Sequence, residues 1–389
     1  MKFGLVGPNG APATWTSVSG GMIEDDMIVI DGAQTRLTFE GVANRPVPSL
    51  LRGFSAPVNL ETGLGEAEQL FLARHDSDPF NRWQALQEIA TALLTRAARG
   101  TAWTAESVAA LGAAIADSIA SPDLDDAFKA NVLSLPTEAN IARVLASDVD
   151  PDAIHRVRVN LIAALAAAAY TALRTAYAAS AVTAPYSPDA TQAGKRALRQ
   201  AALAFLVRGG ADGAPALARE QYETATNMSD RFGALAAAVT SWTADAPALL
   251  ADFRGRFGAD PLVFDKWLAL SASPAEDGTL ERVQAILAEP DFPRNNPNRL
   301  RALVGSFASA NPVQFARADG AGFRFVAGFV ADVDKRNPQV ASRILTTFRN
   351  FRTYEPGRRA AAETALRGLA DAGGLSRNVA DILERTLSA

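Results

Sequence analysis

The sequence predicts a mainly α-helical protein in which a small β region precedes a long array of helices. The chain changes character near residue 65. Before that point, short β-branched runs alternate with glycine and proline, a pattern typical of strands and turns. After it, alanine and leucine dominate, and apolar residues recur at helical spacing over the rest of the chain. Asparagine-proline pairs recur in this second part and mark helix starts.

The β region contains about four or five short runs with strand character. Met27–Ile30 and Thr35–Phe39 are joined through Asp31-Gly32, which predicts a hairpin. Arg45–Arg52 and Ala56–Leu60 predict further strands, with prolines at edges or strand starts where a missing N–H costs little. A β-sandwich usually has about seven strands. We therefore expect this region to lack strands on its N-terminal side.

Helix starts in the second part are marked by a capping side chain directly before a proline. Asp78-Pro79 predicts one start, and Asn296-Pro297, Asn311-Pro312 and Asn337-Pro338 predict others. Helix lengths and spacings are irregular, and no repeat consensus of fixed period can be written. We therefore expect a degenerate stack of antiparallel helix pairs, an armadillo- or HEAT-like solenoid, whose concave face binds other molecules.

One segment, Leu161–Leu173, is almost purely apolar and rich in alanine. A membrane-spanning helix needs about 20 strongly apolar residues. This run is shorter, Arg158 precedes it and Arg174 follows it. The segment therefore predicts a core helix that its neighbours approach closely through small side chains.

Composition excludes several classes of function. With 48% hydrophobic residues the chain can bury a large core. The 38 basic and 42 acidic residues nearly balance, so there is no long-range positive field to gather nucleic acid. The absence of cysteine excludes disulfides and thiol catalysis, and suits a reducing cytoplasm. Glycine and proline interrupt the first residues before any signal-peptide core forms, so we expect a cytoplasmic protein.

The two histidines do not form a metal motif. His75 and His155 lie far apart in the sequence, and neither shares a helix face with a second histidine four positions away. A surface or capping role is the ordinary interpretation of each. The sequence therefore predicts no metal ligand among the histidines, and any catalysis must be carried out by other groups or elsewhere.

The helix predicted to start at Pro338 has two contrasting faces. Apolar and polar side chains separate into two sets: Val340, Ile344, Phe348 and Phe351 against Gln339, Arg343, Thr347 and Asn350. Gln339 and Arg343 are four residues apart and point the same way. Together an amide and a guanidinium could hold a peptide carbonyl or carboxylate. An ordinary solvated face is the alternative, and both interpretations apply equally to Arg299 and Arg301.

Several stretches, taken in their order and spacing, resemble the C-terminal region of bacterial aminopeptidase N, an alanyl aminopeptidase of the M1 zinc metallopeptidase family. The resemblance runs the whole length of the chain. The stretches are Pro46–Val58, Phe80–Ala85, Asn227–Asp230, Asp265–Trp267, Asn296–Phe307, Asn311-Pro312 with Phe315 and Asp319-Gly320, and Arg336–Arg343.

The resemblance implies which parts of such an enzyme are present. The complete enzymes have an N-terminal β domain, a thermolysin-like catalytic domain, a small Ig-like β-sandwich and a large armadillo-like helical domain. This chain matches the last two, so we expect a truncated Ig-like domain at 1–65 and the helical domain at 66–389. The family's His-Glu-x-x-His zinc motif and its Gly-x-Met-Glu-Asn segment have no counterpart here. Zinc would therefore belong to the full-length enzyme, and this chain alone should be inactive.

The resemblance also implies a role. The helical domain of these enzymes caps the catalytic cleft and limits access to short peptides. Gln339 and Arg343 match positions that reach toward the bound peptide, and Arg301 is a further candidate lining the same cavity. The implied partners are the catalytic and N-terminal domains of the same enzyme and short peptides, with no nucleic acid or membrane. The alternative is a stand-alone helical scaffold or peptide-binding module without enzymatic activity.

Overall fold

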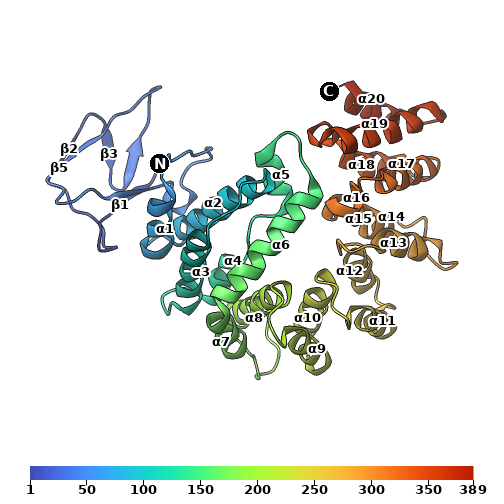
Figure 1. Cartoon of the computed structure of the whole chain (residues 1–389), viewed down its shortest axis with the longest axis horizontal. Helices are drawn as coiled ribbons and strands as arrows, with labels where there is room; N and C mark the ends of the chain where they lie inside the picture. The colour runs from blue at the N-terminus through green and yellow to red at the C-terminus, as the bar shows by residue number, and fades with distance from the viewer. Residues whose placement is uncertain (389) are drawn as a thin grey trace. The chain divides into compact units, whose positions relative to one another are not determined.

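The computed structural model of the chain describes residues 1–388, with short strands first and helices after them (Figure 1). The strands are β1 (Phe3–Val6), β2 (Ser17–Ser19), β3 (Met22–Glu24), β4 (Met27–Val29), β5 (Thr38–Glu40) and β6 (Val47–Leu50). The α-helices are α1 (Glu66–His75), α2 (Pro79–Ala98), α3 (Ala105–Ala120), α4 (Asp126–Val132), α5 (Glu138–Leu145), α6 (Pro151–Ala168), α7 (Tyr170–Ala179), α8 (Ala190–Arg208), α9 (Ala214–Thr224), α10 (Met228–Thr240), α11 (Ala246–Phe257), α12 (Pro261–Ser271), α13 (Thr279–Ala288), α14 (Pro297–Leu300), α15 (Ser306–Ala310), α16 (Pro312–Phe315), α17 (Ala321–Asp334), α18 (Pro338–Leu345), α19 (Pro356–Asp371) and α20 (Arg377–Ser388). Short 3₁₀ segments are η1 (Arg52–Phe54), η3 (Thr346–Phe348) and η4 (Phe351–Thr353), and η2 (Arg301–Gly305) is a π-helical turn. The predicted mainly α fold class is confirmed.

The strands pair as antiparallel ribbons, β1 with β6, β2 with β5 and β3 with β4. The predicted hairpin through Asp31-Gly32 was therefore wrong. Strand β4 pairs instead with β3, and the register of Glu24 opposite Met27 leaves a two-residue turn between them. Asp25 in this turn has a φ of 55°. Aspartate tolerates that left-handed conformation, which suits the twist of a tight hairpin.

The predicted strand at Ala56–Leu60 is absent from the described structure, and the segment forms a bend and irregular chain. The backbone turns back on itself because the Val58 N–H donates to the Ala56 carbonyl over 2.9 Å. Pro57 has no N–H to offer a neighbouring strand. A local turn therefore takes the place of the expected sheet ladder.

All four predicted helix starts are confirmed. Each capping side chain accepts a hydrogen bond from a backbone N–H of the first turn, and proline occupies the first helical position: Asp78 from Asn81, Asn296 from Asn298, Asn311 from Gln314, and Asn337 from Val340. These caps satisfy donors that have no partner within the helix.

The predicted single helix at Leu161–Leu173 is in fact two helices. Helix α6 ends at Ala168 and α7 begins at Tyr170, with a bend of 79° between them. The bend lets Leu165 before it and Leu173 after it both be buried completely. Within residues 1–388, no single helix has the length and apolar character to cross a membrane, and only this bent pair passes on those two criteria together.

Close packing through small side chains does occur at the end of α6. A Cβ added to Gly112 of α3 would lie 2.6 Å from the Cβ of Ala168. Atoms cannot approach that closely, so the glycine permits the contact between the two helices. The prediction of close packing through the alanine-rich segment is confirmed at this contact.

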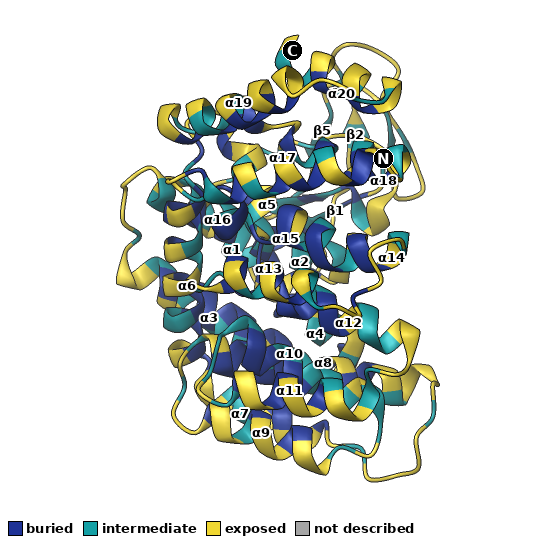
Figure 2. Cartoon of the chain, turned by 90° about the vertical axis from the view of Figure 1, so that its right-hand side faces the viewer, coloured by how far each residue is buried: buried dark blue, intermediate teal, exposed yellow. Residues whose placement is uncertain are grey.

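The chain forms two compact units. The first comprises Met1–Pro136 and Leu161–Phe205, and the second comprises Thr137–Asn160 and the described residues from Leu206 onward. In the second unit the helices from α9 to α20 follow one another in sequence order, and neighbouring helices pack together (Figure 1). Each buries one face (Figure 2). This serial packing is that of a helical solenoid.

An aromatic cluster forms part of the core of the second unit. Phe315, Phe323 and Phe348 are each no more than 2% exposed, and their ring centroids lie 5.0 to 5.7 Å apart. The pairs Phe315–Phe323 and Phe315–Phe348 meet edge to face. Such contacts add to the free energy gained by burying the rings. The cluster fixes α16, α17 and the turn after α18 relative to one another.

A second connection joins distant parts of the sequence within the second unit. Val149 exchanges backbone hydrogen bonds with Thr353 and Glu355, and Arg358 reaches the carboxylates of Asp150 and Asp152. The Arg358–Asp152 pair spans 206 positions. We call Val149, Asp150, Asp152 and the segment Thr353–Arg358 the clasp. The clasp fixes the start of α6 against the start of α19.

Arg358 is the centre of the clasp. Its side chain is only 6% exposed, and it also pairs with Glu355 at 3.2 Å and donates from Nε to the Ala316 carbonyl over 2.6 Å. A buried guanidinium is tolerated only when its donors are satisfied, as they are here. Burial also raises the pKa of the neighbouring Tyr354 to about 12. The Tyr354 phenol therefore stays neutral at physiological pH.

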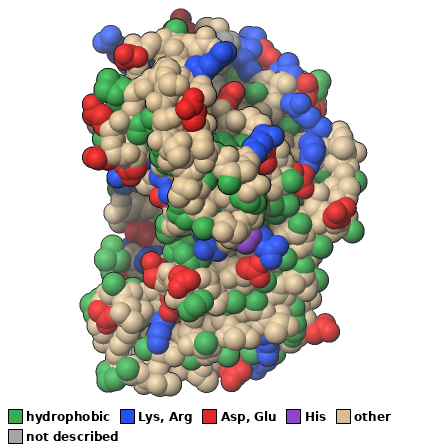
Figure 3. Space-filling model, turned by 90° about the vertical axis from the view of Figure 1, so that its left-hand side faces the viewer, with side chains coloured by type: hydrophobic (Ala, Val, Ile, Leu, Met, Phe, Trp, Pro, Cys, Tyr) green, Lys and Arg blue, Asp and Glu red, His purple; other side chains and the backbone are tan. Residues whose placement is uncertain are grey.

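Surface charges are mixed in sign. Figure 3 shows basic and acidic side chains interspersed over the face that it displays. Several charged side chains elsewhere form ion pairs across one helical turn, such as Arg336 with Asp332 at the end of α17 and Arg367 with Glu363 on α19. This distribution agrees with the near-balance of charge in the composition, and it offers no extended basic surface for nucleic acid on that face.

Candidate functional site

The predicted site residues Gln339 and Arg343 both lie on α18. The Asn337 cap and Pro338 start the helix, and Val340 and Ile344 are buried on its inner side at 4% and 2% exposure. Gln339 and Arg343 occupy the opposite side and are exposed. The two-faced helix predicted from the sequence is therefore present up to Leu345, where 3₁₀ turns take over.

Neither of these two side chains stabilises the fold through a polar contact with another side chain. Within residues 1–388, the Gln339 amide and the Arg343 guanidinium have no hydrogen bond or ion pair to another side chain. This contrasts with neighbouring Arg336, which is held by Asp332 at 2.7 Å. A one-turn stripe thus presents five guanidinium N–H donors and a complete amide to water. Such a stripe can bind a carbonyl or carboxylate group.

Arg301 and Arg299 have different surroundings although they are two residues apart. Arg299 is 7% exposed, pairs with Asp265 and donates to the Pro261 carbonyl. Arg299 therefore anchors α14 to α12. Both interpretations offered by the sequence, a solvated side chain and a ligand-binding one, were wrong for this residue. Arg301 is exposed, and its guanidinium donates to the Asn298 side chain over 2.5 Å.

The structure brings the segments that carry these residues together. Arg301 opens the π-helical turn η2, and η2 packs against α18. A π turn inserts an extra residue into a helix and changes the direction of the side chains around it, and such turns are frequent at functional sites. Arg301 is bonded to Asn298, however, and within residues 1–388 it makes no hydrogen bond with Gln339 or Arg343. Gln339 and Arg343 share one stripe, while Arg301 lies on the adjacent segment.

The described acidic and histidine side chains do not gather into a metal site. Within residues 1–388 there is no group of three or more histidine, cysteine, aspartate or glutamate residues that could hold a metal ion. His155 is paired with Glu138 at 2.7 Å, and His75 packs on the Phe71 ring with centroids 4.8 Å apart. A zinc ion, which takes three or four such ligands, does not fit the residues present.

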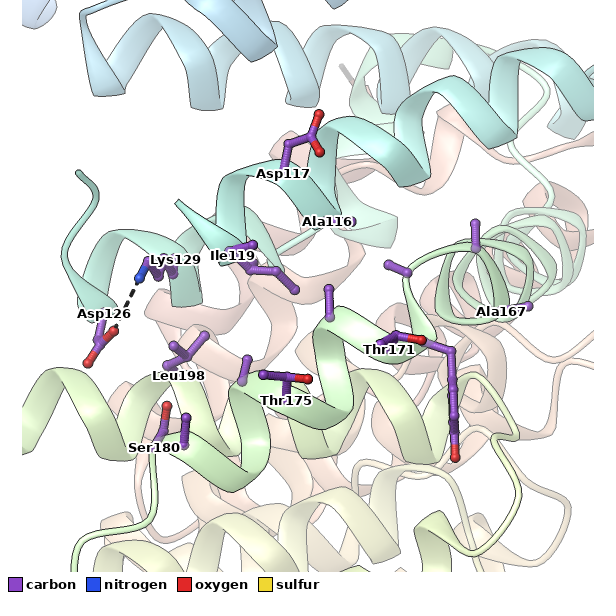
Figure 4. Close-up of a pocket in the computed structure, with 17 residues that line it drawn as sticks. Ala116, Asp117, Ile119, Asp126, Lys129, Ala167, Thr171, Thr175, Ser180 and Leu198 are labelled. Carbon is purple, nitrogen blue, oxygen red and sulfur yellow. Dashed lines mark ion pairs between the residues drawn. The ribbon is translucent and has the colours of Figure 1, made fainter. Parts of the chain in front are cut away.

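The first unit contains a groove that was not predicted from the sequence. It has a volume of about 760 Å³ and is bordered by α3, α4, α7 and α8 (Figure 4). Alanines form much of its wall, and its polar groups include Thr171, Thr175 and the ion pair of Asp126 with Lys129. The sequence feature that could have indicated this groove is the excess of alanine. Small side chains around the break between α6 and α7 leave a hollow on the surface. The polar groups do not form a catalytic arrangement.

The fold and the exposed stripe on α18 define a class: a short β part followed by an armadillo-type helical array that presents polar donors. Comparison with protein families agrees. Residues 1–63 match a domain of unknown function with an Ig-like fold, DUF3458, and residues 66–388 match its companion domain of ARM repeats, DUF3458_C. The chain belongs to the DUF3458_C family. These matches confirm the predicted Ig-like and armadillo-like parts.

The curated relatives agree with the resemblance seen in the sequence. The chain is 36% identical over 378 residues to aminopeptidase N of Caulobacter vibrioides, covering 95% of this chain and 43% of that protein. It is 33% identical over 374 residues to aminopeptidase N of Escherichia coli, covering 95% of this chain and 42% of that protein. The chain thus spans less than half the length of these relatives. It is homologous to the C-terminal part of M1-family aminopeptidase N.

A solved structure supports the fold alone. The chain resembles aminopeptidase A of Legionella pneumophila, crystallised in complex with aspartic acid, with a TM-score of 0.85 and 24% sequence identity. The match covers 100% of this chain and 45% of that one. The same arrangement of elements therefore occurs within a longer protein.

Proposed function

We propose that this chain is the non-catalytic C-terminal part of a zinc-dependent aminopeptidase N, which removes N-terminal amino acids from peptides. In this proposal the helical part, residues 66–389, caps the catalytic cleft and restricts access to short peptides. The observation that carries the proposal is the pair of consecutive family matches together with relatives named aminopeptidase N, of which this chain covers 42% to 44%. The zinc ion and the catalytic groups belong to the remaining part of the enzyme.

Gln339 and Arg343 are the proposed peptide-binding residues, with Arg301 beside them. All three side chains are exposed, which supports this assignment. In addition, Gln339 and Arg343 have no hydrogen bond or ion pair to another side chain within residues 1–388. A guanidinium offers a planar fork of donors that matches a carboxylate, and an amide both donates and accepts. These groups can orient a peptide without taking part in the bond cleavage.

The alternative, a stand-alone helical scaffold or peptide-binding module, rests on the solenoid itself, because solenoids present extended binding surfaces. The two proposals differ in whether the chain requires the catalytic part in order to act. A cap acts only when the catalytic part is present, whereas a stand-alone module binds its ligand by itself. The relatives named aminopeptidase N favour the cap.

The purified chain should release no product from alanyl-amide substrates, with or without added zinc. No group of residues in 1–388 can hold the metal, so the water-activating step has no place in this chain. The measurement is chromogenic amide hydrolysis by material that gives a single band. The E. coli relative serves as the active control. Zinc-dependent activity that copurifies with this chain would contradict the assignment.

Changing Arg343 to alanine should weaken peptide binding when the chain is joined to a catalytic part. Loss of one charge-assisted hydrogen bond costs about 1.5–3 kcal/mol, which corresponds to roughly a tenfold or larger rise in KM. The kcat for a minimal alanyl amide and the zinc content should stay unchanged. Arg385, exposed and paired with Asp381, gives the matched control variant R385A. Equal KM values for the wild-type and R343A enzymes across dipeptides and longer peptides would return Arg343 to the solvated-face interpretation.

A further inference from the structure

The groove of the first unit has the dimensions of a ligand site. Its volume of about 760 Å³ lies within the range of about 300–1,000 Å³ that is usual for such sites. All the residues that line it belong to the first unit. Much of the wall is alanine, so the main chain of a ligand can approach the helices closely (Figure 4): Ala116 and Ala120 of α3, and Ala172, Ala176 and Ala179 of α7.

Three hydroxyl groups, on α7 and on the residue after it, line the groove and have no hydrogen bond within residues 1–388. They belong to Thr171, Thr175 and Ser180, and Ser180 is only 3% exposed although it borders the groove. Helical threonines often donate to the carbonyl one turn earlier, as Thr95 does over 2.8 Å. Thr175 has such a carbonyl before it in α7 and makes no bond to it. All three hydroxyls are therefore available to a molecule in the groove.

The charged side chains that line the groove are already paired. Asp126 pairs with Lys129 at 3.7 Å, and Asp117 pairs with Arg74 of α1 at 2.6 Å. A charged ligand therefore finds no unpaired counter-ion among the lining residues. The hydroxyls that remain are neutral, and each one both donates and accepts a hydrogen bond. This combination favours a neutral ligand with alternating donors and acceptors, which is the chemistry of a peptide main chain.

The spacing of the hydroxyls matches that of an extended main chain. A helix rises about 1.5 Å per residue, so Thr171 and Thr175 lie about 6 Å apart along the axis and Thr171 and Ser180 about 13.5 Å apart. An extended chain advances about 6.7 Å for every two residues and about 13.4 Å for every four. Residues two apart present their N–H and C=O groups on the same edge of such a chain. One edge can therefore meet all three hydroxyls in turn.

We propose that this groove binds an extended peptide segment of about four small residues, whose main chain runs along α7 and bonds to Thr171, Thr175 and Ser180. Side chains of an extended segment alternate in direction, so those that face the alanine wall must be small for the main-chain bonds to form. The inference goes beyond the proposed cap, because the groove lies in the first unit and shares no residue with the Gln339–Arg343 stripe.

The test is binding of acetyl-tetraalanine amide to the purified chain, measured by calorimetry or NMR titration. The same peptide with methylated main-chain nitrogens should bind roughly tenfold or more weakly, because it has no N–H to donate. The double variant T171V/T175V keeps the shape of the wall without two hydroxyls and should lose a similar factor. A179L fills the groove from an exposed position and should also weaken binding. T364V, at an exposed threonine of α19, and R343A should bind as the wild type does.

Three results would overturn the inference. These are no binding of acetyl-tetraalanine amide to the wild-type chain at millimolar concentration, equal binding of the methylated peptide, and unchanged binding by T171V/T175V and A179L in chains with the wild-type circular dichroism spectrum. The first two use the wild-type chain and do not depend on the folding of a variant. Loss of binding in R343A alone would place the peptide on the α18 stripe and equally contradict the groove. None of these results bears on whether the chain completes an aminopeptidase, which is measured by hydrolysis, so the two proposals can fail separately.

Discussion

Replacing Arg358 by alanine should destabilise the second unit by about 3 kcal/mol, near the lower end of the range for breaking a buried ion pair. The lower end applies because Asp150 and Asp152 are 41% and 48% exposed and can return to water. The Ala316 carbonyl, however, would lose its donor in a buried position. The readout is hydrogen exchange at the Val149 and Glu355 amides, which should become roughly a hundredfold faster.

Two variants make this prediction specific to the clasp. R367A removes an exposed i,i+4 pair with Glu363 and should cost well under about 1 kcal/mol. R358K keeps the positive charge without the planar fork and should fall between the wild type and R358A. If R358A left exchange at Val149 and Glu355 unchanged, the clasp would not hold α6 to α19.

Removing the matched C-terminal part from the C. vibrioides relative should abolish its peptide hydrolysis, and supplying this chain in its place should restore it. The reason is that the proposed cap completes the walls of the reaction chamber and positions the peptide, and correct positioning contributes several kcal/mol to catalysis. This relative is the recipient because it is 36% identical to the chain over 95% of its length. The measurement is kcat/KM on an alanyl amide for the native, shortened and exchanged enzymes.

The control for this exchange is the shortened relative carrying only residues 1–63 of this chain, which match the Ig-like family. It should stay inactive if the helical part is what the catalytic part requires. Zinc content should be the same in all the proteins, because the metal belongs to the catalytic part in this proposal. Full activity of the shortened relative would show that the cap is dispensable.

Local features of the fold could be predicted from the sequence because their causes lie within a few residues. An asparagine or aspartate before proline both caps a helix and fixes its first φ angle, so Pro79 and Pro338 were placed correctly. Strand pairing was not predictable in the same way. It depends on which distant run completes the ladder, and the Asp25 turn joined β4 to β3 instead of joining it to the run after Asp31-Gly32.

In the candidate site too, local features could be predicted from the sequence and long-range contacts could not. The two faces of α18 follow from helical spacing, so Gln339 and Arg343 could be assigned to the exposed side. Spacing did not distinguish Arg299 from Arg301, because the partner of Arg299 is Asp265 on another helix. The clasp around Arg358 was missed altogether, since it depends on contacts between residues far apart in the sequence.

The most direct test of the cap is how the activity of the exchanged enzyme depends on substrate length. The measurement is kcat/KM for a series of peptides with N-terminal alanine, from dipeptides to an unfolded polypeptide. We expect efficient cleavage of the short peptides and a steep fall in kcat/KM for the longest substrates. Equal efficiency across the whole series, at wild-type zinc content, would contradict a role for this chain in restricting access.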